Sequence, residues 1–88
     1  MKLYVVVIND IDYEQCESNA SVCKNATLNK KEAFTKMCEI CKNDFQNAKQ
    51  NGFKGVHIDK DDENMERTLY YSRELDHYSN YRVQEIEA

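Results

Sequence analysis

The cysteines of this 88-residue chain are the side chains whose spacing most directly suggests chemistry. Cys38 and Cys41 form a C-x-x-C motif, whereas Cys16 and Cys23 lie upstream in a C-x6-C arrangement. Four thiolates can hold zinc tetrahedrally, but paired C-x-x-C knuckles are the usual pattern, and the upstream pair departs from it. Cys38 and Cys41 instead fall on the apolar stripe of a predicted helix, where cysteine packs as a small hydrophobe. We therefore expect core packing and no metal, with a zinc site as the alternative.

Other residues that could support catalysis are sparse. His57 and His77 are the only histidines, and neither has a neighbour in sequence that would make it a convincing base. Gly52 and Gly55 are the only glycines, too few for a phosphate-binding loop. The acidic segment 59–64 resembles a calcium loop in composition but lacks the glycine and the glutamate that such a loop needs. We expect a non-catalytic protein without a cofactor.

One long amphipathic helix is the clearest element. Asn29 can cap its start with Glu32 reaching back, and the Asn51-Gly52 pair supplies the stop. Apolar residues recur at steps of three and four and form one stripe: Phe34, Met37, Cys38, Cys41, Phe45 and Ala48. Ile40 lies off this stripe and either extends the buried edge or faces solvent.

The remaining elements are predicted strands. They cover residues 2–9, 54–59, 67–73 and 81–86, with a short additional strand near 21–24. In the last strand Ile86 falls on the opposite face from Tyr81 and Val83, which predicts either a bulge or apolar residues on both faces. The predicted fold is α+β, with residues 1–88 forming a single domain. An antiparallel sheet of four to five strands carries one long amphipathic helix packed on one face.

The first strand poses a packing problem. Residues 3–8 read Leu-Tyr-Val-Val-Val-Ile, so the strand is apolar on both faces. A single helix can cover only one of them. We expect the second face to be covered by residues 10–28, by a second copy of the chain or by a different protein.

Charge is distributed unevenly along the chain. Residues 1–53 carry equal numbers of lysines and acidic residues, whereas residues 54–88 carry five basic and nine acidic residues, which accounts for the whole net charge of −4. This excess argues against direct nucleic-acid binding and fits a basic partner. No apolar run reaches membrane-spanning length, and the N-terminus does not resemble a signal peptide. We expect a protein of the bacterial cytoplasm without membrane contact.

Tyrosines are interleaved with these acidic residues. Tyrosine is enriched at protein interfaces, and the adjacent Tyr70 and Tyr71 must face opposite sides of their strand, one of them toward the helix. The predicted partner-binding residues are Asp59, Asp61, Asp62, Glu63, Glu66, Tyr70, Glu74, Asp76, Tyr78 and Tyr81.

The order KLYVVV, a helix opening NKKEAF, then GVHID, TLYY and YRVQEIE resembles a group of small acidic α+β proteins encoded by phages and mobile elements. That group includes anti-CRISPR and other anti-defence inhibitors. The resemblance implies an inhibitor that binds a host defence protein, typically a nuclease effector. A homodimer with a structural or regulatory role and a zinc-binding module are the alternative functions.

Overall fold

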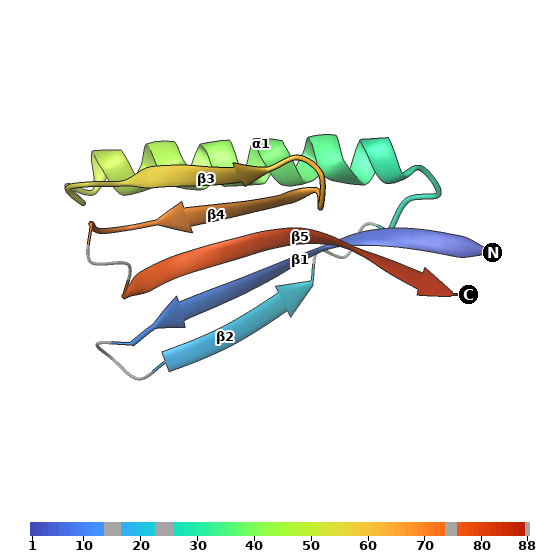
Figure 1. The fold of residues 1–88 in the computed structure, drawn as a ribbon, viewed down its shortest axis with the longest axis horizontal. Helices are drawn as coiled ribbons and strands as arrows, with labels where there is room; N and C mark the ends of the chain where they lie inside the picture. The colour runs from blue at the N-terminus through green and yellow to red at the C-terminus, as the bar shows by residue number, and fades with distance from the viewer. Residues whose placement is uncertain (14–16, 23–25, 74–75, 88) are drawn as a thin grey trace.

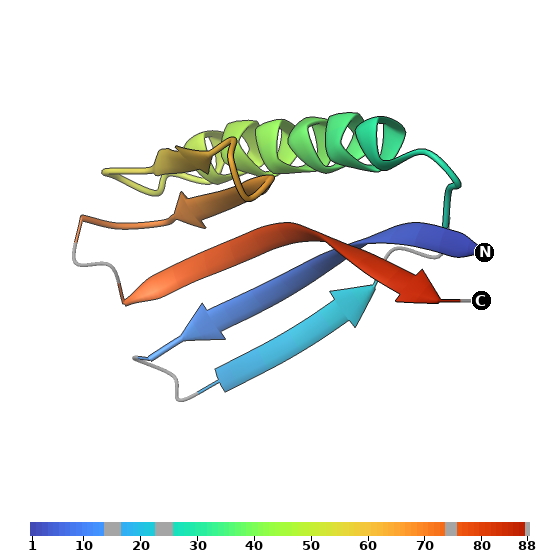
Figure 2. The same cartoon turned by 45° about the vertical axis from the view of Figure 1, so that its right-hand side comes forward.

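The computed structural model describes residues 1–13, 17–22, 26–73 and 76–87. The elements are β1 (Lys2–Asp12), β2 (Glu17–Val22), α1 (Lys30–Gln50), β3 (His57–Asp61), β4 (Glu66–Tyr70) and β5 (His77–Glu87). The strands form one antiparallel sheet in the order β2-β1-β5-β4-β3, and α1 lies along one side of it (Figures 1 and 2). The predicted α+β fold with one helix packed on an antiparallel sheet is confirmed.

Local hydrogen bonds set both ends of α1. The side chain of Asn29 accepts from the backbone N–H groups of Lys31 and Glu32, as the predicted cap requires. The Asn29 N–H donates to the Thr27 hydroxyl at 2.8 Å, so threonine takes the place predicted for the Glu32 side chain. At the other end Gly52 has a φ of +86°, and its N–H donates to the Lys49 carbonyl, which confirms the predicted stop. No helix in the described ranges is long and apolar enough to cross a membrane.

The strands differ from the prediction mainly in length. β1 and β5 both extend further than the apolar runs indicated and pair continuously from Lys2 with Glu87 to Asp12 with His77. This pairing contains no bulge, and Ile86 lies opposite Leu3 on the sheet face away from the helix. The predicted strand near 21–24 overlaps the end of the longer β2 at residues 21–22, whereas residues 23 and 24 lie outside the described residues. β3 begins three residues later than the predicted 54–59.

The core lies between α1 and the three central strands. Its fully buried side chains are Val6, Met37, Cys41, Leu69 and Tyr81. Ile40, Tyr71 and Cys38 are partly buried against this cluster, so Ile40 extends the buried side of the helix. Tyr71 is thus the tyrosine of the adjacent pair that joins the core.

The second sheet face receives no covering layer from the described part of residues 10–28. Residues 17–22 pair with β1 as an edge strand, which widens the sheet instead of covering it. Thr27 forms an isolated bridge to Tyr4. Val5 faces away from the helix and is only 6% exposed, so the first half of β1 is sheltered on both sides. The accessible part of this face lies toward the other end of β1, beside β5, β4 and β3.

Candidate binding surface

The sheet face opposite α1, here called the open face, is organised in rows that run across the strands. Strand alternation and the pairing register align one residue from each strand in every row. The first row consists of His57, Tyr70, Tyr78, Ile11 and Ser18. The second consists of Asp59, Thr68, Asn80, Asn9 and Ala20. The third consists of Asp61, Glu66, Arg82 and Val7. Aromatic rings are thus concentrated in the first row, amide and hydroxyl side chains in the second row beside Asp59, and most of the charged side chains in the third.

Three rings of the first row and the ring of Tyr13, which follows the end of β1, form a continuous ladder. His57 stacks on Tyr70 with centroids 4.8 Å apart, Tyr70 lies 5.7 Å from Tyr78, and Tyr78 lies 6.3 Å from Tyr13. His57 is also held through its Nδ1, which lies 2.8 Å from the Gly55 carbonyl oxygen. We call His57, Tyr70, Tyr78 and Tyr13 the aromatic ladder. Because each ring contacts a neighbour from another strand, the ladder is held in place before any partner arrives.

A shallow hollow lies between the ladder and the second row. Its volume is about 550 Å³, and it is lined by Asn9, Ile11, Tyr13, Ser18, Thr68, Tyr70, Tyr78 and Asn80. The Asn80 amide donates to the Thr68 hydroxyl at 3.1 Å, which orients both side chains. A hydrogen bond with Tyr13 is the main reason that the pKa of Tyr78 lies above its usual value. Rings on one wall and amides on the floor suit a partner side chain with both apolar and polar parts.

Acidic residues dominate the charged positions of the open face. The second and third rows contain three acidic residues, Asp59, Asp61 and Glu66, and one basic residue, Arg82. Asp61 also accepts hydrogen bonds from the side chain and backbone of Asn64, which lower its pKa. Asp61 is thus ionised at neutral pH, and the excess of acidic side chains gives this side of the hollow a negative potential.

The other predicted acidic residues lie beyond the two ends of the rows. Asp62 and Glu63 are exposed in the β3–β4 turn, where Asp62 pairs with Arg67 at 2.7 Å. Asp76 lies beyond the aromatic row, where its carbonyl oxygen accepts from the Tyr13 N–H and its carboxylate accepts from the Ser72 hydroxyl. Negative charge therefore flanks the ladder on both sides. Glu74, the remaining acidic residue of the predicted surface, lies outside the described residues.

Tyr81 was wrongly assigned to the partner-binding surface. It is 0% exposed and faces α1, and its hydroxyl donates to Asp44 at 2.5 Å. Burial and this hydrogen bond raise the pKa of Tyr81 far above its usual value. Tyr78 and Tyr81 are three residues apart in one strand, so strand alternation places them on opposite faces. Only Tyr78 of the two is available to a partner.

Several residues of the open face were not among the partner-binding residues predicted from the sequence. His57 and Tyr13 belong to the ladder, and Asn9, Thr68 and Asn80 line the hollow. A signal existed for His57, which shares its face with Asp59 by strand alternation. Tyr13 had no such signal, because its position depends on how far β1 extends.

The C-x-x-C motif lies on the helix side of the sheet, away from this surface. Cys41 is 1% exposed, and burial raises its pKa to about 11, so its thiol is neutral at physiological pH. Cys38 packs against the same cluster, which confirms the predicted core packing of both residues. Cys16 and Cys23, which the zinc alternative requires, lie outside the described residues.

Comparison with known proteins adds no family assignment. No protein-family model, curated protein or solved structure shows significant similarity to the chain.

Proposed function

We propose that the chain is a non-catalytic binding protein that docks a basic surface of another protein on its open face. The main support for this proposal is the aromatic ladder, which lies on a sheet face without a covering layer in the described residues and is flanked by acidic side chains. Pre-stacked tyrosines supply contact area at low entropic cost, and the carboxylates select a positively charged partner. Direct nucleic-acid binding is disfavoured because Asp59, Asp61 and Glu66 would repel a phosphate backbone.

We further propose that this partner is a bacterial defence nuclease and that binding inhibits it in the cytoplasm. Nucleic-acid-binding channels of nucleases are basic, which is the charge that the open face complements. The resemblance in size and element order to anti-CRISPR-type inhibitors supports the same choice. In this proposal the open face occupies a surface that the nuclease uses for its substrate, and the chain itself performs no reaction.

A phage-infection assay tests this proposal. Bacteria that each carry one defence nuclease, with and without this chain, are challenged with a phage that the nuclease restricts. The expected result is restored plaque formation for at least one nuclease, with inhibition of that purified nuclease at stoichiometric amounts of the chain. Failure to relieve any nuclease in a broad panel contradicts the inhibitor role.

Matched variants connect this effect to the open face. Tyr78→Ala removes the central ring of the ladder and should weaken binding to the nuclease about thirtyfold, the effect of losing an interface hot spot. Asp59→Lys reverses a charge on the open face, whereas Glu39→Lys makes the same change on an exposed helix position. Only the first of these two charge reversals should reduce inhibition. Equal effects of both would mean that the open face is not the docking surface.

The homodimer alternative uses the same face and is distinguished by light scattering. Two copies facing each other would bring Asp59, Asp61 and Glu66 of each chain near those of the other, which costs free energy unless the charges are offset. We therefore expect a monomer at micromolar concentration. A tight dimer that Tyr78→Ala dissociates would support the alternative.

A further inference from the structure

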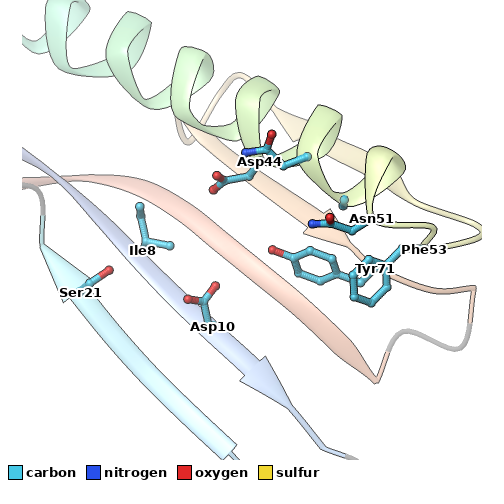
Figure 3. A pocket seen from close by; sticks show the side chains of 9 residues that line it. Ile8, Asp10, Ser21, Asp44, Asn51, Phe53 and Tyr71 are labelled. Atoms are coloured by element: carbon cyan, nitrogen blue, oxygen red, sulfur yellow. The ribbon is translucent and has the colours of Figure 1, made fainter.

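A second concave site lies on the opposite side of the sheet, between the C-terminal half of α1 and strands β1 and β2. Its volume is about 350 Å³, within the range of small-molecule sites. The lining residues are Ile8, Asp10, Ser21, Asp44, Asn47, Ala48, Asn51, Phe53 and Tyr71. Among the described residues, the pocket forms where α1 packs mainly against β1, β5 and β4 and lies away from the edge strand β2 (Figure 3).

Two carboxylates face this pocket from opposite sides. Asp44 extends from α1 toward the sheet, Asp10 extends from β1, and the hydroxyl of Tyr71 reaches between them (Figure 3). The fully buried Ser79 links the sheet residues, because its hydroxyl donates to Asp10 and lies 3.0 Å from the Tyr71 hydroxyl. The hydroxyl of Tyr81, from β5, donates to Asp44. Hydroxyl donors thus hold both carboxylates in position without neutralising them.

The negative charge in the pocket has no cationic counterpart among the described residues. No lysine, arginine or histidine there forms an ion pair with Asp10 or Asp44, and Asp44 is half-buried. Burial raises the pKa of Tyr71, its hydrogen bond with Ser79 opposes this rise, and the nearby charges of Asp10 and Asp44 act in the same direction as burial. Asp44 is partly desolvated and Asp10 is exposed, and two carboxylates without a cationic partner favour binding of a positive charge.

The rest of the lining indicates an organic cation in preference to a metal ion. The described residues contain no group of three or more histidine, cysteine, aspartate or glutamate side chains placed to hold a metal. Phe53 and Tyr71 instead form an aromatic wall, with centroids 5.4 Å apart, and rings of this kind attract ammonium and guanidinium groups. The amides of Asn47 and Asn51 add hydrogen-bond acceptors beside the wall.

We infer that the Asp10–Asp44 pocket binds a small alkylammonium group, with the ammonium between the two carboxylates and the alkyl chain against Phe53. The source is either a free amine or a lysine side chain of another protein. This site is independent of the open face, because it lies on the other side of the sheet.

Titration of the ¹⁵N-labelled full chain with n-butylammonium chloride, at constant ionic strength, tests the inference by NMR. The side-chain amide signals of Asn47 and Asn51 should shift and saturate. Butan-1-ol and butyrate, which are neutral and anionic molecules of similar shape, should leave these signals in place. Equal shifts with butan-1-ol, or saturable shifts only at other positions, would overturn the inference.

Isosteric variants provide the second readout. Asp10→Asn keeps an oxygen that can accept from Ser79 but removes the charge, and it should weaken n-butylammonium binding about tenfold. Asp59→Asn makes the same change on the open face and should leave the affinity unchanged. Unchanged binding in Asp10→Asn would also overturn the inference, provided that its spectrum remains that of the folded chain.

A blocked lysine, N-acetyl-lysine-N-methylamide, separates the two sources. Saturable shifts of the same amide signals would support a lysine side chain as ligand. Binding of n-butylammonium with exclusion of the blocked lysine would support a free amine. Absence of binding by both molecules contradicts the site.

Discussion

Replacing Tyr81 with phenylalanine tests whether the buried hydroxyl of Tyr81 stabilises the fold. The Tyr81 side chain is 0% exposed. Its hydroxyl donates to the Asp44 carboxylate at 2.5 Å, and its ring packs in the core cluster with Met37 and Leu69. Tyr81→Phe keeps the ring and removes only the hydrogen bond. A hydrogen bond to a charged group contributes about 1.5–3 kcal/mol. Because Asp44 is half-buried and water can replace the hydroxyl in part, we expect the lower end, about 1.5 kcal/mol.

Thermal and urea unfolding followed by circular dichroism measure this change. For a domain of this size about 1.5 kcal/mol corresponds to a Tm decrease of roughly 6–12 °C. Tyr4→Phe is the matched control, because the Tyr4 hydroxyl makes an exposed hydrogen bond to Glu85 at 3.3 Å. Its effect should be within about 0.5 kcal/mol. If both variants lowered the free energy of unfolding equally, burial and the bond to Asp44 could not be the reason that the Tyr81 hydroxyl stabilises the fold.

Three further predictions concern backbone strain and titration. Gly55 has a φ of +81°, and an added Cβ would lie 2.7 Å from Cγ of Arg73, so Gly55→Ala should lower the free energy of unfolding by about 1–2 kcal/mol in urea titrations. Burial raises the pKa of Cys41 from 9.0 to about 11, so the unfolded thiol ionises first. Stability should therefore fall between pH 9 and 11, and Cys41→Ala should remove that part of the fall when unfolding is measured across this range. Hydrogen bonds from Asn64 lower the pKa of Asp61. The ionised Asp61 carboxylate therefore stabilises the fold above its usual pKa, and this stabilisation is lost as the pH falls through the lowered pKa. Asn64→Ala should return the Asp61 pKa toward 3.8 in a carboxyl NMR titration.

The helix could be predicted closely because its signals are local. Asn29 and Gly52 act on backbone groups within a few residues, and the apolar spacing reports one face of the same helix. Strand ends were less predictable, since β1 and β5 stabilise each other along their full lengths. Asn9, Asp10 and Asp12 continue a strand that their propensities alone would end, because each is paired with a residue of β5.

The candidate surface was predictable in composition but not in arrangement. Tyr70 and Tyr78 were identified by type, yet their contact depends on the β4–β5 register, which no local pattern determines. Tyr81 could have been excluded, because it shares a strand face with Val83, an apolar residue packed against the core. The prediction gave more weight to the acidic composition of the C-terminal half than to the strand face that Tyr81 shares with Val83.

Alternation along β5 separates the residues that hold the fold from those that face a partner. Ser79 and Tyr81 point toward α1, where both are buried and hydrogen-bonded, whereas Tyr78, Asn80 and Arg82 point to the open face. Substitutions at these three open-face positions leave the helix-side core untouched, because their side chains do not reach it. The open face can therefore change its partner preference with little effect on the Asp10–Asp44 pocket, although residues of one strand support both sites. If binding on one side altered the affinity on the other, the coupling would have to pass through displacement of β5 itself, since no side chain of that strand is shared between the two faces.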